Sequence, residues 1–206
     1  MMDNLEIEVK YHVTDMTEMR QRILALGATP GESHFETNIR FEDRHHSLIQ
    51  RRSLLRLRQD KTATLTFKGE PDMPDTRESG QYKIHREIET TVSDFNATRQ
   101  ILEAVGFFPA QVYEKHRETF RHEGAVICLD TMPYGNFLEI EGNRENIRPL
   151  SDGLGFAWEN RILANYLEMF EFIKNEHNLG FTDVTFENFK DAAVDLPALL
   201  ERFQAT

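Results

Sequence analysis

The sequence has little cysteine, few long apolar runs and a deficit of positive charge. Cys128 is the single cysteine in 206 residues, so no disulfide can form within the chain and a cysteine-rich zinc site is excluded. Apolar runs are only a few residues long, far short of the ~20 residues that a helix needs to cross a bilayer. The formal net charge of −11 disfavours a generic nucleic-acid surface, because such surfaces are usually basic.

The remaining composition is that of an ordinary globular protein with a sizeable core. Hydrophobic residues make up 39% and charged residues 29%, and the length fits one domain that spans residues 1–206. The N-terminal run MMDNLEIEVK carries acids where a signal peptide would need a basic and then an apolar region. We therefore expect a cytoplasmic protein without a membrane or nucleic-acid partner.

Eight segments have the short length, the alternation and the turn-forming boundaries of β-strands. They are Leu5–Val13, His34–Asp43, Ser53–Asp60, Thr62–Gly69, Gln81–Val92, Ala110–His122, Ala125–Thr131 and Asn136–Gly142. The polar stretch Gly69–Gly80 contains two prolines and predicts a loop. Apolar residues at helical spacing predict a helix over Trp158–His177 and a final amphipathic piece, so helices would cover the barrel from about residue 155 to 206.

Two further helices interrupt the strands and suggest an internal repeat. Asp15–Leu26 and Asp94–Val105 each begin at an aspartate that can cap a helix, and each is followed by a glycine. Gly27 comes twelve residues after Asp15, and Gly106 comes twelve residues after Asp94. The alternative is chance similarity between two amphipathic helices. A true repeat predicts that two halves close one sheet.

The predicted strands carry charged residues on one face and apolar residues on the other. Glu6, Glu8 and Lys10 alternate with Ile7 and Val9, for example. A solvated face is the ordinary explanation of one such strand. Several of them, with acids grouped on some strands and bases on others, favour a closed sheet whose polar face points inward. The sequence thus predicts an α+β fold in which a closed eight-stranded antiparallel β-barrel spans about residues 4–143 and helices pack outside.

The charged residues of this face suit a triphosphate and a divalent metal. A triphosphate with about four negative charges would be bound by basic side chains, of which arginine is a bidentate ligand. The candidate phosphate ligands are Lys10, Arg56, Arg58, Lys68, Lys115 and Arg117. Carboxylates are hard oxygen ligands that suit Mg²⁺ or Mn²⁺. The candidate metal ligands are Glu6, Glu8, Glu139 and Glu141, with Asp130 either a ligand or a turn cap.

Seven ordered segments together resemble the CYTH superfamily, the triphosphate tunnel metalloenzymes. They are the ExExK run Glu6–Lys10, LLRLR (Leu54–Arg58), TLTFKG (Thr64–Gly69), REIE (Arg86–Glu89), EKHR (Glu114–Arg117), CLD (Cys128–Asp130) and FLEIEG (Phe137–Gly142). The resemblance implies an eight-stranded barrel, dependence on Mg²⁺ or Mn²⁺, and a triphosphate substrate. The run from Leu102 to Gly142 is most similar to the bacterial class IV adenylyl cyclase branch.

The candidate catalytic residues are Lys115, Glu87 and Glu89. Lys115 would stabilise charge on the leaving group, and Glu87 and Glu89 would bind metal, orient the nucleophile or only pair with cations. The leading expectation is conversion of ATP to cyclic AMP and pyrophosphate. Hydrolysis of tripolyphosphate or thiamine triphosphate is the alternative, and a non-catalytic domain that binds nucleotide or polyphosphate is a second one. A barrel side left uncovered would favour a homodimer.

Overall fold

Eight antiparallel strands form one closed ring in the computed structural model, which describes residues 5–71, 80–192 and 194–204. The order around the ring is β1-β5-β4-β3-β2-β6-β7-β8, and β8 pairs with β1 to close it. The strands are β1 (Leu5–His12), β2 (Thr29–Asp43), β3 (Leu54–Gln59), β4 (Ala63–Gly69), β5 (Lys83–Val92), β6 (Phe107–His122), β7 (Ala125–Met132) and β8 (Gly135–Glu141). The predicted α+β class with an eight-stranded antiparallel sheet is confirmed.

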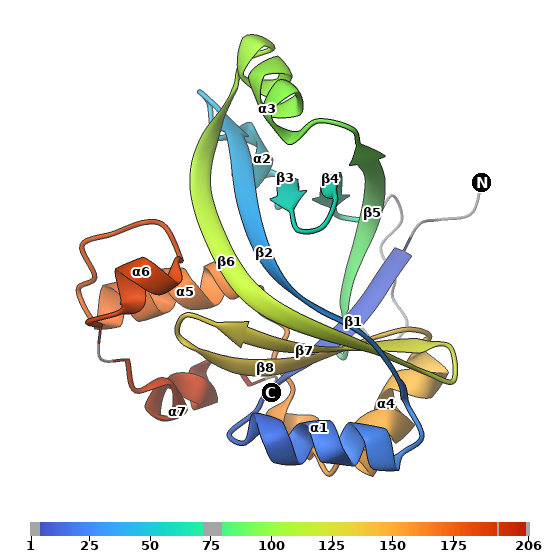
Figure 1. Ribbon diagram of the computed structural model, residues 1–206. Helices are drawn as coiled ribbons and strands as arrows, with labels where there is room; N and C mark the ends of the chain where they lie inside the picture. The colour runs from blue at the N-terminus through green and yellow to red at the C-terminus, as the bar shows by residue number, and fades with distance from the viewer. Residues whose placement is uncertain (1–4, 72–79, 193, 205–206) are drawn as a thin grey trace.

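Helices lie outside the ring, as expected (Figure 1). They are α1 (Met16–Ala25), α2 (Ser47–Gln50), α3 (Phe95–Ala104), α4 (Arg144–Gly153), α5 (Tyr166–Glu176), α6 (Phe186–Phe189) and α7 (Leu196–Leu199), with short 3₁₀ turns at Trp158–Asn160 and Leu200–Arg202. None of the helices in the described part of the chain combines the length and the apolar character needed to cross a membrane.

The two helices predicted between strands, α1 and α3, begin directly after the aspartates that were expected to cap them. The Asp15 side chain accepts a hydrogen bond from the Glu18 backbone N–H at 2.9 Å, and Asp94 accepts one from the Ala97 N–H at 2.8 Å. The segments β1-α1-β2 and β5-α3-β6 share one element order, and their strands pair as β1 with β5 and β2 with β6. This arrangement agrees with the internal repeat.

The long strands β2 and β6 begin earlier than predicted. The sequence placed their starts at His34 and Ala110, whereas the structure starts them at Thr29 and Phe107. The extra residues include Pro30, which reads as a turn former. The pairing with β6 accommodates them through an irregular register between Pro30 and Ser33.

The C-terminal region differs most from the prediction. A continuous helix from Trp158 is wrong, because the 3₁₀ turn at Trp158–Asn160 is followed by extended chain and α5 starts only at Tyr166. Asn165 caps α5 and forms a capping box with Glu168, a start signal that lies inside the apolar pattern. The helices α2 and α4 were not predicted. The α4 sequence contains Pro149, which disfavours a helix in sequence-based reasoning.

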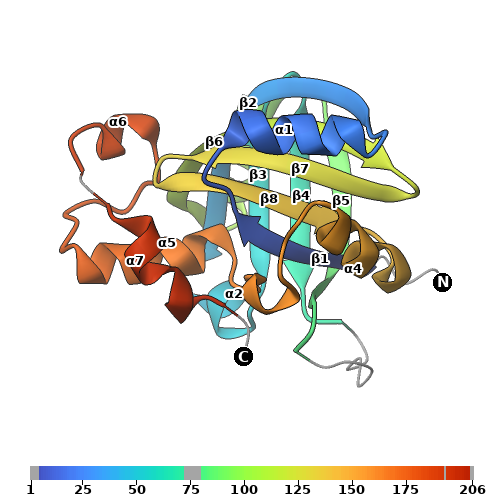
Figure 2. The ribbon, with the colours of Figure 1, turned by 90° about the horizontal axis from the view of Figure 1, so that it is seen from below.

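The apolar faces of the strands pack under two groups of helices. In the first group, α1 and α4 cover one side of the ring, where Val9 and Ile140 of the strands meet Ile23 of α1 and Ile147 of α4. In the second group, α5, α6 and α7 gather beside the end of the β7–β8 hairpin, as Figures 1 and 2 show. Phe137 of β8 and Phe170 of α5 belong to that second core. These cores occupy the outer face of β1, β7 and β8, so the alternate polar residues of these strands point into the ring.

Candidate functional site

Polar side chains from all eight strands meet inside the ring. The side chains that form ion pairs or close acidic groups there are Glu6, Glu8 and Lys10 of β1, Glu36 of β2, Arg56 and Arg58 of β3, Lys68 of β4, Lys83, Glu87 and Glu89 of β5, Lys115 and Arg117 of β6, Asp130 of β7, and Glu139 and Glu141 of β8. Every site residue named from the sequence is in this set. Glu36 and Lys83 are additions.

Asp130 and Glu139 organise the cations on the β6 side. Arg117 donates to both oxygens of Asp130, with Nε at 2.7 Å and Nη2 at 2.5 Å, and Nη2 also lies 2.5 Å from Glu139. Lys115 Nζ is 3.1 Å from Asp130, and Lys10 Nζ is 3.4 Å from Glu139. Burial raises the pKa of Glu139, but Lys10 and Arg117 outweigh burial and hold the pKa well below its ordinary value. Glu139 therefore stays ionised beside Lys10 and Arg117, and Asp130 accepts hydrogen bonds from Arg117 and Lys115.

Two groups from the C-terminal segment complete this arrangement and were not predicted. The Tyr166 hydroxyl donates to Asp130 Oδ2 at 2.8 Å, and the Lys10 Nζ lies 3.9 Å from the centre of the Tyr166 ring. Lys10 also donates to the backbone carbonyl of Ala164 at 2.9 Å. Burial and the Asp130 carboxylate raise the pKa of Tyr166 well above its ordinary value, so the hydroxyl stays protonated and can donate. In the sequence, Tyr166 reads only as an apolar helix position.

Replacement of Tyr166 by phenylalanine is expected to lower the free energy of unfolding by about 1.5–3 kcal/mol, because a buried hydrogen bond to a charged carboxylate is lost. Denaturant unfolding of the purified variant would measure the change. Tyr113→Phe is the matched control, since the Tyr113 hydroxyl contacts Arg56 at a longer 3.5 Å. An equal loss in both variants would show that the Asp130 contact has no special weight.

Glu36 occupies the centre of a second group of cations. Its side chain is 0% exposed, and its Oε2 lies 3.3 Å from Arg58 Nε and 3.7 Å from Lys115 Nζ. Its Oε1 lies 4.0 Å from Arg117 Nε and 3.2 Å from His34 Nε2. Burial raises the pKa of Glu36, but Lys115, Arg117 and Arg58 hold it well below its ordinary value. The sequence carries a signal for Glu36, because it alternates with other polar residues in the predicted second strand.

The side of the interior formed by β3, β4 and β5 carries two more cations, Arg56 and Lys68, and the two candidate catalytic acids of β5. Arg56 Nη2 is 3.1 Å from Thr66 Oγ1 and 3.6 Å from Glu89, whose side chain is 45% exposed. Lys68 Nζ lies 3.4 Å from Glu87. Glu87 and Glu89 thus contact cations in this structure, which is one of the three roles that the sequence left open for them.

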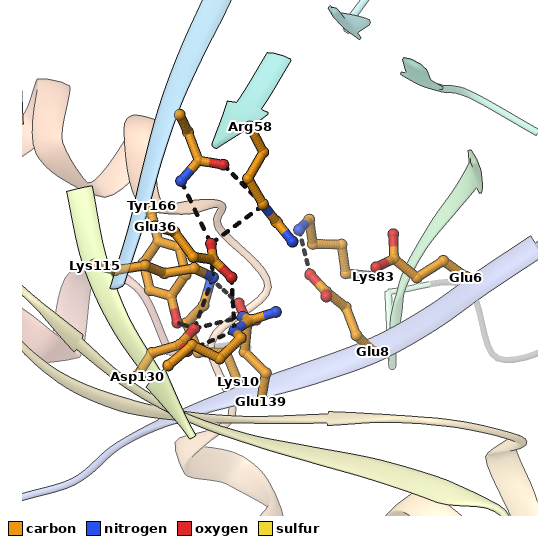
Figure 3. A network of polar contacts seen from close by, with 12 residues as sticks. Glu6, Glu8, Lys10, Glu36, Arg58, Lys83, Lys115, Asp130, Glu139 and Tyr166 are labelled. Atoms are coloured by element: carbon orange, nitrogen blue, oxygen red, sulfur yellow. Dashed lines mark hydrogen bonds and ion pairs between the residues drawn. The ribbon is translucent and has the colours of Figure 1, made fainter. Parts of the chain in front are cut away.

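A group of three carboxylates lies where β1, β5 and β8 meet. Ligand oxygens of Glu6, Glu8 and Glu141 all lie within 4.8 Å of one another. Lysines pair with two of them. Lys68 Nζ is 2.5 Å from Glu6. Lys83 donates to Glu8, and Figure 3 shows this second pair. Oxygen-only ligands suit Mg²⁺ or Mn²⁺, so the donor set of this three-carboxylate group fits the expected metal. Lys83 shares the strand face of Glu87 and Glu89, and this alternation could have revealed it.

The structure separates the five predicted metal ligands into two sets. Glu6, Glu8 and Glu141 come together, whereas Asp130 and Glu139 face arginine and lysine. A second potential cation group, formed by His34, Glu36 and Asp60, lies on β2 and just beyond the end of β3. Arg58, Lys115 and Arg117 surround its central carboxylate and would repel a divalent cation.

Metal affinity of the three-carboxylate group is expected to depend on pH near neutrality. Burial raises the pKa of Glu141 to about 7, Glu8 and Glu6 add to the rise, and Arg117 opposes it. Because the pKa of this carboxyl group is raised in the folded protein, its ionisation lowers the free energy of unfolding of the metal-free protein as the pH rises toward 7. The ionised carboxylate, which is the form that binds a metal, appears through the same pH range.

We expect Mn²⁺ to bind about tenfold more tightly at pH 8 than at pH 6, because the ionised fraction of Glu141 rises by about that factor. Calorimetric titration of the protein with Mn²⁺ at both pH values would measure the difference. Glu141→Gln should bind more weakly and with a flatter pH profile. Equal affinity at pH 6 and pH 8 in the unmodified protein would contradict this role of Glu141.

Comparisons with known proteins agree with the architecture. Residues 4–157 match the CYTH domain. A Methanocaldococcus jannaschii protein named "Putative adenylate cyclase" is 25% identical over 177 residues, which cover 80% of this chain and 98% of that protein. A Vibrio parahaemolyticus structure described in the same words has a TM-score of 0.71 at 20% identity, over 82% of this chain and 98% of that one.

A third structure has the same fold, but its description names a triphosphatase activity. The structure from Hippeastrum is described as a "putative adenylyl cyclase" that reveals a dominant triphosphatase activity. It has a TM-score of 0.52 at 19% identity and covers 72% of this chain and 85% of its own. At this identity the likeness concerns the fold alone. Because the match to the family spans residues 4–157, well over half of the sequence, this chain belongs to the CYTH domain family.

Proposed function

We propose that the protein is a metal-dependent enzyme that acts on a triphosphate inside the ring, with conversion of ATP to cyclic AMP and pyrophosphate as its leading reaction. The observation that carries the proposal is that one closed ring holds both a three-carboxylate group and a group of cations from β3 and β6. A phosphate chain needs the cations, and a Mg²⁺ or Mn²⁺ ion needs the acids. The family membership and the name of the M. jannaschii relative support this choice.

Basic side chains from several strands would bind the triphosphate together inside the ring. Arg58 of β3 and Lys115 and Arg117 of β6 surround a common space, and Lys10 lies beside Glu139. Phosphoryl transfer depends mainly on positioning and charge neutralisation, so these side chains would hold the triphosphate extended and stabilise charge on the leaving group. Glu6, Glu8 and Glu141 would hold the metal, which supplies Lewis-acid stabilisation of phosphate oxygens when bound.

The cyclase reaction needs one new bond and one broken bond. The ribose 3′-oxygen attacks the α-phosphorus, the bond from the α-phosphorus to the bridging oxygen of the β-phosphate breaks, and pyrophosphate leaves with that oxygen. The proton of the 3′-hydroxyl passes to a carboxylate or to water. Glu87, 23% exposed and beside Lys68, is a candidate acceptor on β5.

Hydrolysis of a triphosphate is the second candidate function. The same cations would then hold the substrate while water attacks the terminal phosphorus, and the name of the Hippeastrum structure shows that one protein of this fold favours such a reaction. The product identifies the reaction. Incubation with ATP, thiamine triphosphate and tripolyphosphate, each with Mg²⁺ and with Mn²⁺, should be followed by chromatography for cyclic AMP, ADP and pyrophosphate.

We expect cyclic AMP and pyrophosphate from ATP. ADP and phosphate as the only products, with faster cleavage of tripolyphosphate, would decide for the hydrolase. Tight binding of these compounds without any product would instead assign a sensor role. The same assay without divalent ions tests the metal requirement.

A further inference from the structure

Glu36 is a carboxylate placed among the cations that would bind phosphate. On β2 it is the register partner of Lys115 on β6, and its neighbour on the same face, Asn38, is the partner of Arg58 on β3. Its side chain is 0% exposed, and Figure 3 shows it between Arg58 and Lys115. Every ligand that reaches these cations therefore approaches Glu36 as well.

The contacts of Glu36 are long compared with those of Asp130. Asp130 accepts from Arg117 at 2.7 and 2.5 Å and from Tyr166 at 2.8 Å, so its oxygens are well occupied. Glu36 lies no closer than 3.2 Å to His34, 3.3 Å to Arg58 and 3.4 Å to the Asn38 amide. An ionised carboxylate has about four acceptor positions at its two oxygens. Glu36 thus keeps acceptor capacity for a donor on a ligand, whereas Asp130 has little left.

A bound phosphate chain and Glu36 would compete for the same cations. Tripolyphosphate ends in a charged phosphate at both ends, so when its chain lies on Arg58, Lys115 and Arg117 the end next to Glu36 brings like charge to the buried carboxylate. A substrate that presents a hydroxyl or an amino group at this point would donate a charge-assisted hydrogen bond instead. Specificity of this kind arises from a repulsive element as much as from an attractive one.

We propose that Glu36 is a specificity-determining residue that accepts a hydrogen bond from a hydroxyl or amino group on the organic part of the substrate, and so favours an organic triphosphate over inorganic tripolyphosphate. This inference rests on the proposed function, because it assumes that a triphosphate binds inside the ring. His34 and Asn38 hold the Glu36 carboxylate in place from either side.

The test compares two constants in one ATP-turnover assay: the KM of ATP and the inhibition constant of tripolyphosphate as a competitor. In Glu36→Gln, we expect the inhibition constant of tripolyphosphate to fall at least about tenfold, because a repelling charge is removed. The KM of ATP should instead rise by a similar factor, because an amide accepts a weaker hydrogen bond than a carboxylate. Glu118→Gln is the matched control, since Glu118 pairs with Arg20 outside the ring and both constants should stay within about twofold.

Each outcome separates this inference from the function on which it rests. If the unmodified protein turns over no triphosphate, the proposed function and the inference both fall. If turnover occurs but the two constants of Glu36→Gln change in the same direction by the same factor, the inference falls and the function stands. If the variant does not fold, the unmodified protein still decides: tripolyphosphate should inhibit at concentrations above the KM of ATP, and inhibition at lower concentrations would overturn the inference.

Discussion

Replacement of Glu8 by glutamine is expected to lower turnover on the order of 100-fold or more while the ring stays folded. Glu8 is 4% exposed and belongs to the three-carboxylate group with Glu6 and Glu141. Glutamine keeps the shape and one acceptor oxygen for Lys83, so the pairing on β5 survives. It removes the negative charge that a divalent ion requires, and metal sites lose large factors when their ligands are disturbed. Glu6→Gln should behave in the same way.

The measurement is kcat at saturating Mg²⁺ and Mn²⁺, with circular dichroism and thermal unfolding as checks of the fold. Glu103→Gln is the matched control, because Glu103 lies on the exposed surface of α3 and pairs only with Arg99 among the ion pairs described for it. Near-normal turnover of Glu8→Gln at saturating metal would remove Glu8 from the metal site.

The cations of β3 and β6 should each be worth more than tenfold in kcat/KM. Arg58 and Lys115 lie on either side of Glu36, with side chains 15% and 4% exposed, and each would make a charge-assisted contact worth about 1.5–3 kcal/mol to a phosphate oxygen. Arg58→Ala is expected mainly to raise KM, because the proposed role of Arg58 is to bind substrate. Lys115→Ala is expected mainly to lower kcat, because Lys115 would stabilise the charge that develops on the leaving group.

Steady-state kinetics of both variants would measure the division between KM and kcat. Arg99→Ala supplies the control, since the Arg99 side chain is 46% exposed on α3 and forms only an i,i+4 pair with Glu103 among its described ion pairs. If Arg58→Ala and Lys115→Ala resemble this control, the polar interior is not a phosphate site.

Strand alternation was the part of the sequence that predicted most of the interior. A period of two requires that Glu6, Glu8 and Lys10 share a face, and the apolar partners Val9 and Tyr11 on the other face pack under helices. The same rule applied to β2 and β5 would have added Glu36 and Lys83. The alternation gives the face of the sheet on which a residue lies, but it does not give the residue that pairs with it on the neighbouring strand.

The contacts that the sequence did not reveal join residues far apart in the chain. Asp130 was predicted as a metal ligand, and an acid on an inward face is equally suited to pair with a basic side chain. The register of β6 with β7 places Arg117 opposite Asp130, and alternation within one strand could not give this pairing. Tyr166 reaches Asp130 across 36 residues, from a helix whose start depends on a capping box. The sequence around Tyr166 or around Asp130 therefore does not predict that the two side chains form a hydrogen bond.

The ring order also has a consequence for how the chain folds. β1 is the first strand of the sequence, yet its two neighbours are β5 and β8. Both edges of β1 pair with strands that are synthesised more than seventy residues later in the chain. Such non-local pairing slows folding. Until it forms, the unpaired strand edges are exposed to other chains. The ladder that closes the ring sets Glu8 opposite Glu141, so the three-carboxylate group is assembled only in the last step. A chain arrested before β8 would therefore contain the basic residues of the interior but not the complete three-carboxylate group.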